Sequence, residues 1–128
     1  MKTFSISDIG KRREMNQDYM YTSENAVGNL PNLFIVADGM GGHKAGEYAS
    51  RYTVETIVES IEKDERTEPV EVIEHAICKA NEELIKKAAG DEAMSGMGTT
   101  VVVVTVIGKK AWVANVGDSR MYVVGKEI

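Results

Sequence analysis

The strongest candidate for chemistry in this sequence is Asp38, which directly follows an apolar run of strand length at residues 33–37. Three glycines come within the next four residues, in the sequence Asp-Gly-Met-Gly-Gly-His at residues 38–43. A buried strand holds a carboxylate rigidly, and glycines let backbone carbonyl and amide groups come close to a ligand. This pattern favours a metal ion as the ligand of the carboxylate. A simple turn that ends the strand is the alternative interpretation.

The glycines at residues 39–42 do not match either common phosphate-binding loop. A dinucleotide fingerprint that begins with the first of them needs a glycine five residues later, where Lys44 stands. A Walker motif counted from Gly41 needs lysine directly after Gly46, but Glu47 follows. The sequence therefore argues against a nucleotide-binding α/β domain.

Two further aspartates stand at positions that suit ligand binding. Asp18 ends the polar segment at residues 10–18, in which Arg13 precedes an Asn-Gln pair. A guanidinium beside amide groups suits an oxyanion bound next to a metal, and a solvated charged loop is the alternative. Asp118 lies in a Gly-Asp-Ser turn, where a metal ligand and a plain turn aspartate are both plausible.

The composition is that of an ordinary globular domain. The 128 residues are 43% hydrophobic and carry a formal net charge of -5, which argues against a surface that binds nucleic acid or an anionic membrane. No apolar run approaches the roughly 18 residues of a membrane span, and the first residues lack the apolar core of a signal peptide. The single cysteine, Cys78, is expected to be a small buried residue in a reducing compartment. These features predict a cytoplasmic protein.

Apolar spacing predicts two amphipathic helices, one over residues 44–63 and one that begins at Pro69 and is ended by Gly90. On the second helix, His75 points away from the apolar stripe. A turn or hairpin loop is expected at residues 24–32. Alternating or continuous apolar runs predict six strands, at residues 3–7, 19–22, 33–37, 101–107, 111–116 and 120–124.

The strand at residues 101–107 is apolar or Thr throughout, as expected of a strand buried on both faces. It should form an antiparallel meander with the two strands that follow, and Asp118 then occupies the tight turn between the last two. The number of strands and the need for cover on both faces favour an α+β fold. In that fold one sheet packs on another, with the helices outside.

Four short motifs occur together and span nearly the whole chain. They are Gly10-x-x-Arg13-x-x-Asn16-Gln17-Asp18, Asp38-Gly39-Met40-Gly41-Gly42-His43, Gly98-Thr99-Thr100 and Val116-Gly117-Asp118-Ser119-Arg120. In this order they resemble the motifs of the metal-dependent protein serine/threonine phosphatase family, also called PPM or type 2C, in its compact bacterial form.

The resemblance implies a central β-sandwich flanked by helix pairs, in the layer order α/β/β/α, with two Mn²⁺ or Mg²⁺ ions at one end. By this likeness, Asp38 bridges the two metals, the Gly39 carbonyl oxygen binds one of them, and Asp18 serves the same metal directly or through water. Arg13 holds the substrate phosphate. Asp118 matches the position associated in bacterial members with a third, weaker metal. Oxygen-only ligands of this kind suit hard cations.

The implied activity is hydrolysis of phosphoserine and phosphothreonine in proteins by metal-activated water. Asp38 and Arg13 are the expected catalytic residues, because one bridges the metals and the other neutralises charge on the phosphoryl oxygens. The expected partners are phosphorylated proteins, such as the substrates of a bacterial Ser/Thr kinase. Neither a nucleic acid nor a membrane is expected as a partner.

Two positions depart from the family pattern. Many eukaryotic members have a histidine directly after Asp-Gly, where it is thought to protonate the leaving group, but here Met40 holds that position. His43 lies three residues further on, and its role stays open between contact with substrate and a structural histidine. Gln17 stands where other members carry a glutamate beside Asp18.

The resemblance covers roughly the first half of the family's catalytic domain. Two aspartates that complete the metal site in that family have no candidate after Asp118. Residues 1–128 are therefore expected to be the N-terminal part of a single catalytic domain, which by itself is inactive and self-associates through exposed sheet surfaces. An inactive pseudophosphatase that serves as an interaction module is the alternative function, although the retained aspartates favour an active parent protein.

Overall fold

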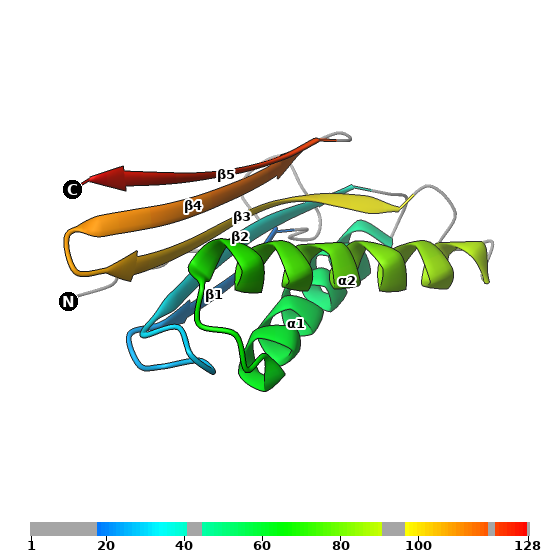
Figure 1. The fold of residues 1–128 in the computed structure, drawn as a ribbon. Coiled ribbons are helices and arrows are strands. Elements are labelled where there is room, and N and C mark those ends of the chain that lie inside the picture. Colours follow the sequence, from blue (N-terminus) through cyan, green and yellow to red (C-terminus); the bar gives the residue numbers. More distant parts are fainter. Residues whose placement is uncertain (1–17, 41–44, 91–96, 118–119, 128) are drawn as a thin grey trace.

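The computed structural model describes residues 18–40, 45–90, 97–117 and 120–127 (Figure 1). Within them, five antiparallel strands form one sheet in the order β1-β2-β3-β4-β5, and two helices cover one of its faces. The elements are β1 (Asp18–Ser23), β2 (Leu33–Met40), α1 (Ala45–Lys63), α2 (Pro69–Ala89), β3 (Gly98–Ile107), β4 (Lys110–Gly117) and β5 (Arg120–Glu127).

The elements predicted from apolar spacing are largely confirmed. Both helices and five of the predicted strands are present, and each of these strands extends further than predicted at one end or both. The last three strands form the expected antiparallel meander. The sixth predicted strand, at residues 3–7, lies outside the described residues.

The two helices return the chain to the end of the sheet at which β2 finishes. Met40 at the end of β2 and Gly98 at the start of β3 face each other in the antiparallel ladder. Helix α1 has 19 residues and α2 has 21, so at about 1.5 Å per residue the outward and return paths have similar lengths. Residues at the end of β2 therefore lie beside residues at the start of β3, although more than fifty residues separate them in the sequence.

The core lies between the helices and the sheet. Alternate residues of the strands point toward the helices and are buried, as the pattern of side-chain directions in a strand requires. Helix α1 packs across the first three strands, and α2 packs on β3 and β4. The most deeply buried members are Leu30, Leu33, Ile35, Ala37, Val54, Ile57, Ile61, Val72, Ile73, Ala76, Ala80, Val103 and Ala114.

Local signals in the sequence explain where α2 begins and ends. Pro69 takes the first helical position, where its missing N–H is not needed. The Glu68 carboxylate accepts a hydrogen bond from the Val70 backbone N–H at 3.3 Å, which caps the first turn. At the other end, the Gly90 N–H donates to the Lys86 carbonyl at 3.2 Å. The predicted boundaries of this helix are therefore confirmed.

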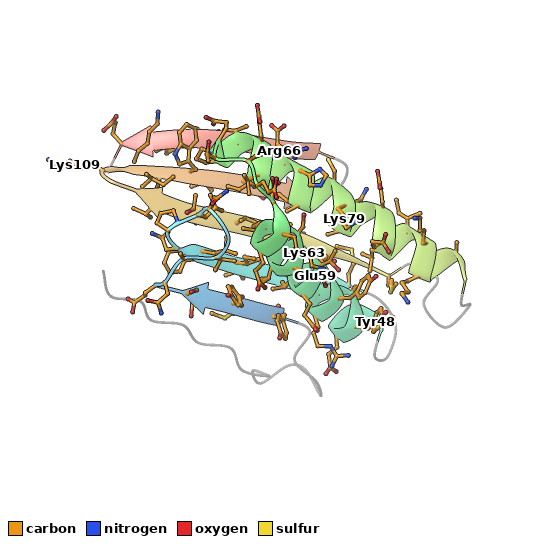
Figure 2. All side chains as sticks on the ribbon, turned by 60° about the horizontal axis from the view of Figure 1, so that its bottom comes forward. Tyr48, Glu59, Lys63, Arg66, Lys79 and Lys109 are labelled. Carbon is orange, nitrogen blue, oxygen red and sulfur yellow. The ribbon has the colours of Figure 1, made fainter. Side chains whose placement is uncertain are left out.

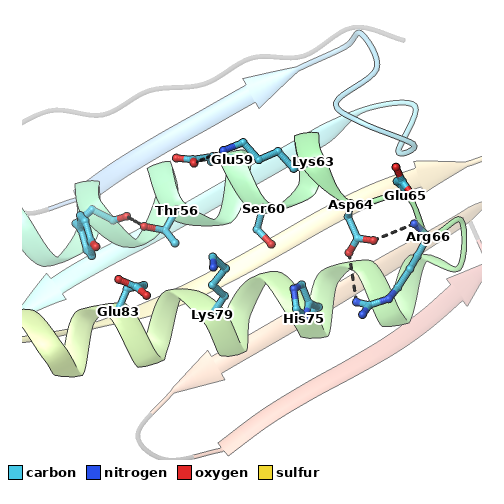
Figure 3. Close-up of a pocket in the computed structure, with 11 residues that line it drawn as sticks. Thr56, Glu59, Ser60, Lys63, Asp64, Glu65, Arg66, His75, Lys79 and Glu83 are labelled. Atoms are coloured by element: carbon cyan, nitrogen blue, oxygen red, sulfur yellow. Dashed lines mark hydrogen bonds and ion pairs between the residues drawn. The ribbon is translucent and has the colours of Figure 1, made fainter.

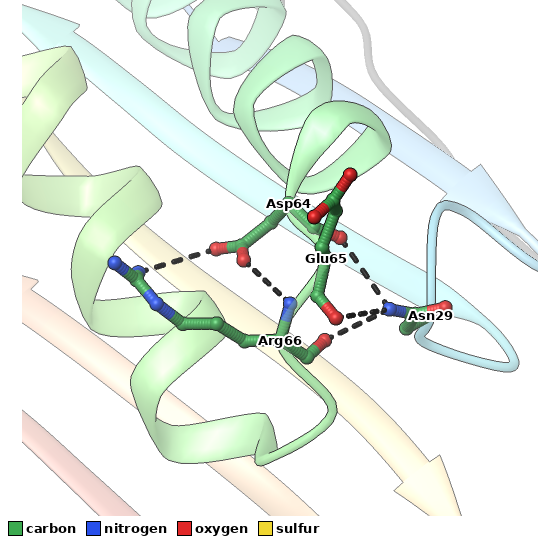
Figure 4. Close-up of polar contacts among 4 residues, drawn as sticks. All are labelled: Asn29, Asp64, Glu65 and Arg66. Atoms are coloured by element: carbon green, nitrogen blue, oxygen red, sulfur yellow. Dashed lines mark hydrogen bonds and ion pairs between the residues drawn. The ribbon is translucent and has the colours of Figure 1, made fainter.

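A loop between β1 and β2 is fastened to the connection between the helices (Figure 4). The Asn29 amide nitrogen donates to the carbonyl oxygens of Glu65 and Arg66, each at 3.0 Å. Gly28 adopts a left-handed conformation with φ 56°, and a Cβ atom there would clash with the Ile61 carbonyl oxygen. The loop therefore needs glycine both for its conformation and for its close approach to α1.

Asn32 joins the start of β2 to the end of β3. Its side chain donates to the Val106 carbonyl at 2.8 Å and accepts from the Val106 N–H at 2.7 Å. The Thr105 hydroxyl donates to the Asn32 carbonyl at 2.8 Å. Asn32 is only 4% exposed, so these bonds satisfy polar groups that water cannot reach. They fix the β2–β3 register at the end opposite to Asp38.

The face of the sheet that points away from the helices is largely apolar. Val36 and Val124 on this face are 48% and 47% exposed, and the described residues provide no layer that covers it. The expected burial of residues 101–107 on both faces is therefore wrong for this structure, because only the helix-facing side is fully buried. We call this surface the open face, and its larger apolar members are Met20, Phe34, Val36, Met40, Val102, Val104, Val106, Val113 and Val124.

The described residues thus form one sheet and one helix pair of the expected α/β/β/α arrangement, and the second sheet is not among them. The prediction that Cys78 is buried is wrong, because its side chain is exposed on α2. His75 is exposed, as predicted. No helix in the described part of the chain combines the length and apolar character needed to cross a membrane.

Replacing Gly28 with alanine should destabilise the protein more than the same change at Gly108. Both glycines have positive φ, but a Cβ at Gly108 meets nothing within 4 Å. Gly108→Ala should lower the free energy of unfolding by about 1 kcal/mol through backbone strain alone. Gly28→Ala should lower it by about 3 kcal/mol, because it adds a clash with the Ile61 carbonyl. Urea unfolding followed by circular dichroism measures both, and equal losses would contradict the proposed packing of the loop.

Candidate metal centre

Asp18 and Asp38 lie directly opposite each other on neighbouring strands. They form a residue pair in the antiparallel ladder between β1 and β2. The Asp38 side chain is exposed, and Asp18 is half-buried. Side chains at such paired positions share a face, with Cβ atoms about 4.5–5.5 Å apart. The structure therefore brings together the two described carboxylates that the sequence predicts as metal ligands.

The Asp38 carboxylate belongs to the strand itself. Strand β2 continues to Met40 and remains paired with β3 throughout, so the interpretation of Asp38 and Gly39 as a strand-ending turn is wrong. On its other side, Asp38 is paired with Thr100 of β3. Asp18, Asp38 and Thr100 therefore form a row across three strands, near one end of the open face.

The apolar pattern of β2 determines the direction of the Asp38 side chain. Ile35 and Ala37 are 1% and 0% exposed because they face the helices. Side chains alternate along a strand, so Asp38 must face the open side. A slip of one residue would move Asp38 into the core and Ala37 out of it. The burial of β2 thus places the carboxylate where a ligand can reach it.

The structure describes only some of the other predicted site residues. Gly39 is buried in β2 and paired with Thr99 of β3. Gly117 ends β4 at the same end of the sheet as Thr100, because the β3–β4 ladder pairs Val101 with Val116. Asp118 follows Gly117 in the sequence but is outside the described residues, as are Arg13, Asn16, Gln17, His43 and Ser119.

The donor set fits a hard divalent cation. Two carboxylates directly opposite each other across a sheet are close enough to bind one cation together. Carboxylate and hydroxyl oxygens suit Mg²⁺ and Mn²⁺ better than soft metals. The described residues contain no group of three or more His, Cys, Asp and Glu side chains that could hold a metal. Asp18 and Asp38 alone would therefore leave most of the coordination of a metal to other donors.

Thr100 belongs to the Gly98-Thr99-Thr100 motif, which by itself predicts no role for this residue. Its place beside Asp38 depends on the β2–β3 register, which joins residues far apart in the chain. Sequence spacing alone carries no signal for such a neighbour. By contrast, the Thr99 hydroxyl donates a hydrogen bond to the Thr100 carbonyl oxygen at 2.8 Å, within β3 itself.

A polar hollow of about 820 Å³ lies elsewhere, between the outer sides of α1 and α2 (Figure 3). Charges of both signs line it, including Glu59 and Lys63, whose side chains are 2.7 Å apart. Their hydrogen bond lowers the pKa of Glu59 and raises that of Lys63. These exposed pairs are typical of a solvated helix surface. The hollow includes neither Asp18 nor Asp38.

Comparison with known proteins identifies the family. Residues 10–127 match the family model described as Protein phosphatase 2C. The chain belongs to the protein phosphatase 2C family. This confirms the resemblance drawn from the four motifs, and it agrees with the helix pair and antiparallel sheet described above.

Relatives in the protein phosphatase 2C family are about twice as long as this chain. The protein phosphatase PhpP of Streptococcus pneumoniae is 36% identical over 124 residues, which cover 94% of this chain and 49% of PhpP. A serine/threonine phosphatase of S. agalactiae of known structure is 34% identical with a TM-score of 0.72, over 93% of this chain and 52% of its own. The chain thus spans about half the length of the curated relatives it matches.

A solved structure of the catalytic domain of the serine/threonine phosphatase PstP contains two manganese ions. It is 24% identical to this chain, with a TM-score of 0.74 over 95% of this chain and 54% of that one. At this level of sequence identity, the structural similarity supports only a shared fold. The case for a metal in this chain therefore depends on its own carboxylates.

Proposed function

We propose that this chain is the N-terminal part of the catalytic domain of a metal-dependent phosphoserine/phosphothreonine protein phosphatase. The observation that carries this proposal is the pairing of Asp18 with Asp38 across two strands of the open face. Membership of the protein phosphatase 2C family supports the reaction class. The names of the relatives, which are protein phosphatases, support phosphorylated proteins as substrates.

In this proposal, Asp38 is the principal metal ligand, and Asp18 and the Gly39 carbonyl complete the part of the site that this chain supplies. Bound Mn²⁺ or Mg²⁺ would activate water for attack on phosphorus and neutralise charge on the phosphate. The strands keep the two carboxylates at a fixed spacing, because both backbones are held in the ladder. Asp118, which follows the end of β4, is the proposed ligand of a third ion.

Arg13 is the proposed phosphate ligand. It lies five residues before Asp18 in the sequence, which keeps it within reach of the carboxylate end of β1. A guanidinium can donate two parallel hydrogen bonds to a phosphate and supplies a charge that does not titrate near neutral pH. The role of Arg13 is therefore to orient the phosphoryl group beside the metals.

The remaining half of the family's length would supply further metal ligands and cover the open face. Apolar residues that are about half exposed, such as Val36 and Val124, favour a covering layer over contact with water. We further propose a cytoplasmic location and substrates phosphorylated by a bacterial Ser/Thr kinase. The streptococcal relatives support a bacterial setting.

A protein that joins this chain to the remaining half should hydrolyse p-nitrophenyl phosphate and phosphothreonine peptides only with Mn²⁺ or Mg²⁺. Asp38→Asn should reduce turnover to the level of the metal-free protein, because it removes the principal ligand. Glu74→Gln, which removes an exposed carboxylate on α2, is the matched control and should keep normal activity. Turnover that persists in EDTA, or a near-normal rate for Asp38→Asn, would refute the proposal.

Arg13→Ala in the same protein should chiefly raise KM for a phosphopeptide, with a smaller loss of kcat, because contacts to phosphate act in the ground and transition states alike. The neighbouring Arg12→Ala removes the same charge from the same segment and should change KM little. Steady-state kinetics at saturating Mn²⁺ separates the two. Equal increases in KM for both variants would mean that Arg13 contributes only a general positive charge and does not bind the phosphate directly.

The 128-residue chain alone should bind Mn²⁺ weakly, show no phosphatase activity and self-associate. Two carboxylates and one carbonyl leave most of the coordination of a hard cation to water. The open face and the strand edges remain available to other copies of the chain. Titration calorimetry and light scattering test these expectations. A monomer that binds two Mn²⁺ ions tightly and turns over substrate would contradict them.

A further inference from the structure

The polar hollow between α1 and α2 contains three side chains that point toward one another (Figure 3). Lys79 and His75 extend from α2 toward α1, and the Ser60 hydroxyl extends from α1 toward them. Because His75 and Lys79 are four residues apart, their Cβ atoms lie about 5–6 Å apart on one face of the helix. The two helices thus bring an ammonium, an imidazole and a hydroxyl group to the same space.

Ser60 is the buried member of this set, with an exposed fraction of 8%. Two other hydroxyl groups of α1, on Ser50 and Thr56, donate to backbone carbonyls of the preceding turn at 3.1 and 2.8 Å. The Ser60 hydroxyl forms no hydrogen bond with any described residue. Buried polar groups are usually hydrogen-bonded. Since this hydroxyl faces the hollow, a ligand in the hollow can be its partner.

Lys79 reaches across the hollow toward α1. Figure 2 shows Lys79 on α2 and the Glu59–Lys63 pair on the neighbouring helix. The pKa of Glu59 is lowered chiefly by its hydrogen bond and charge contact with Lys63, and the charge of Lys79 lowers it further. Lys79 itself forms no hydrogen bond or ion pair with a described residue. Its ammonium group therefore has three hydrogen-bond donors available to a ligand.

Four carboxylates line the hollow, and unpaired carboxylates would repel an anion. Three of them are held by cations at 2.7, 3.4 and 3.8 Å, in the pairs Glu59–Lys63, Asp64–Arg66 and Glu83–Lys86. The Asp64 side chain is only 6% exposed and also accepts a hydrogen bond from the Arg66 backbone N–H at 2.9 Å. These pairings largely offset the negative charge of the lining. Lys79 is then the cation that remains for a ligand.

We propose that this hollow binds the phosphate group of a ligand through Ser60, His75 and Lys79. Lys79 can only donate hydrogen bonds, and the other two side chains can donate as well, so the ligand must supply acceptors. A metal ion is disfavoured, because an ammonium group repels it. A phosphate carries acceptor oxygens in several directions, which matches donors that approach from two helices.

The size of the hollow allows two sources of this phosphate group. At about 820 Å³ it is larger than a free phosphate ion, so a phosphorylated serine or threonine side chain can enter it as well. The site goes beyond the proposed catalytic function, because the hollow lies in the helix layer and its lining includes neither Asp18 nor Asp38.

Titration of the 128-residue chain with sodium phosphate, at constant ionic strength and without divalent metal, tests the proposal. Amide NMR signals of Ser60, His75 and Lys79 should shift and saturate, while those of Asp38 and Thr100 should stay in place. Phosphorus NMR of the same samples detects binding through the phosphate signal itself, even if the chain self-associates. Neither catalysis nor metal binding enters these measurements, so their failure would leave the proposed phosphatase function untouched.

Substitutions show which side chains bind the phosphate. Lys79→Gln should weaken phosphate affinity about tenfold through loss of a charge-assisted hydrogen bond. Lys109→Gln is the matched control, because Lys109 is exposed in the turn between β3 and β4, far from the hollow (Figure 2). It should leave the affinity unchanged. Ser60→Ala is a second variant with little effect on packing, and it should weaken binding about threefold.

A phosphothreonine peptide and its unphosphorylated form, titrated in the same way, distinguish the two sources of phosphate. Tighter binding of the phosphopeptide than of inorganic phosphate assigns the hollow to phosphorylated side chains, and weaker binding assigns it to free phosphate. Absence of saturable binding would overturn the proposal. Equal losses of affinity in Lys79→Gln and Lys109→Gln, or the same spectral shifts with sodium chloride alone, would also overturn it.

Discussion

The pairing of Asp18 with Asp38 is the constraint on which the site depends. The core requires Ile35 and Ala37 to face the helices, and this leaves Asp38 on the open face beside another carboxylate. Burial of the apolar neighbours fixes this pairing, because a slip in register would expose a whole row of core side chains.

The opposite end of the sheet holds this register in place. Asn32 forms two hydrogen bonds with the backbone of Val106, and Asn29 ties the β1–β2 loop to the helix connection. The helix pair then returns the chain so that Thr100 lies next to Asp38. These polar contacts at one end thus hold the register that sets two carboxylates side by side at the other, which is where a cation can bind.

Much of the fold follows from sequence patterns, because helix and strand periodicities are local. The same patterns place Asp38 directly after a predicted strand, which the structure extends to Met40, and the four motifs predict the family. They do not reveal that Thr100 joins the row, since the β2–β3 register depends on contacts between distant residues. The prediction that Cys78 is buried is wrong because this residue lies just beside the apolar stripe of α2, one position after Ile77. Residues 101–107 are apolar or Thr throughout, which predicts a strand covered on both faces. The described residues cover only the face that points toward the helices.

The most direct test of the account is an amide NMR spectrum of the chain during addition of Mn²⁺, which broadens resonances near the bound ion. The account predicts that signals of Asp18, Asp38 and Thr100 disappear first, while those of Ser23 and Asn32 at the opposite end of the sheet persist. Broadening that begins instead at the glutamates of α1 and α2 would contradict a metal site at the paired carboxylates.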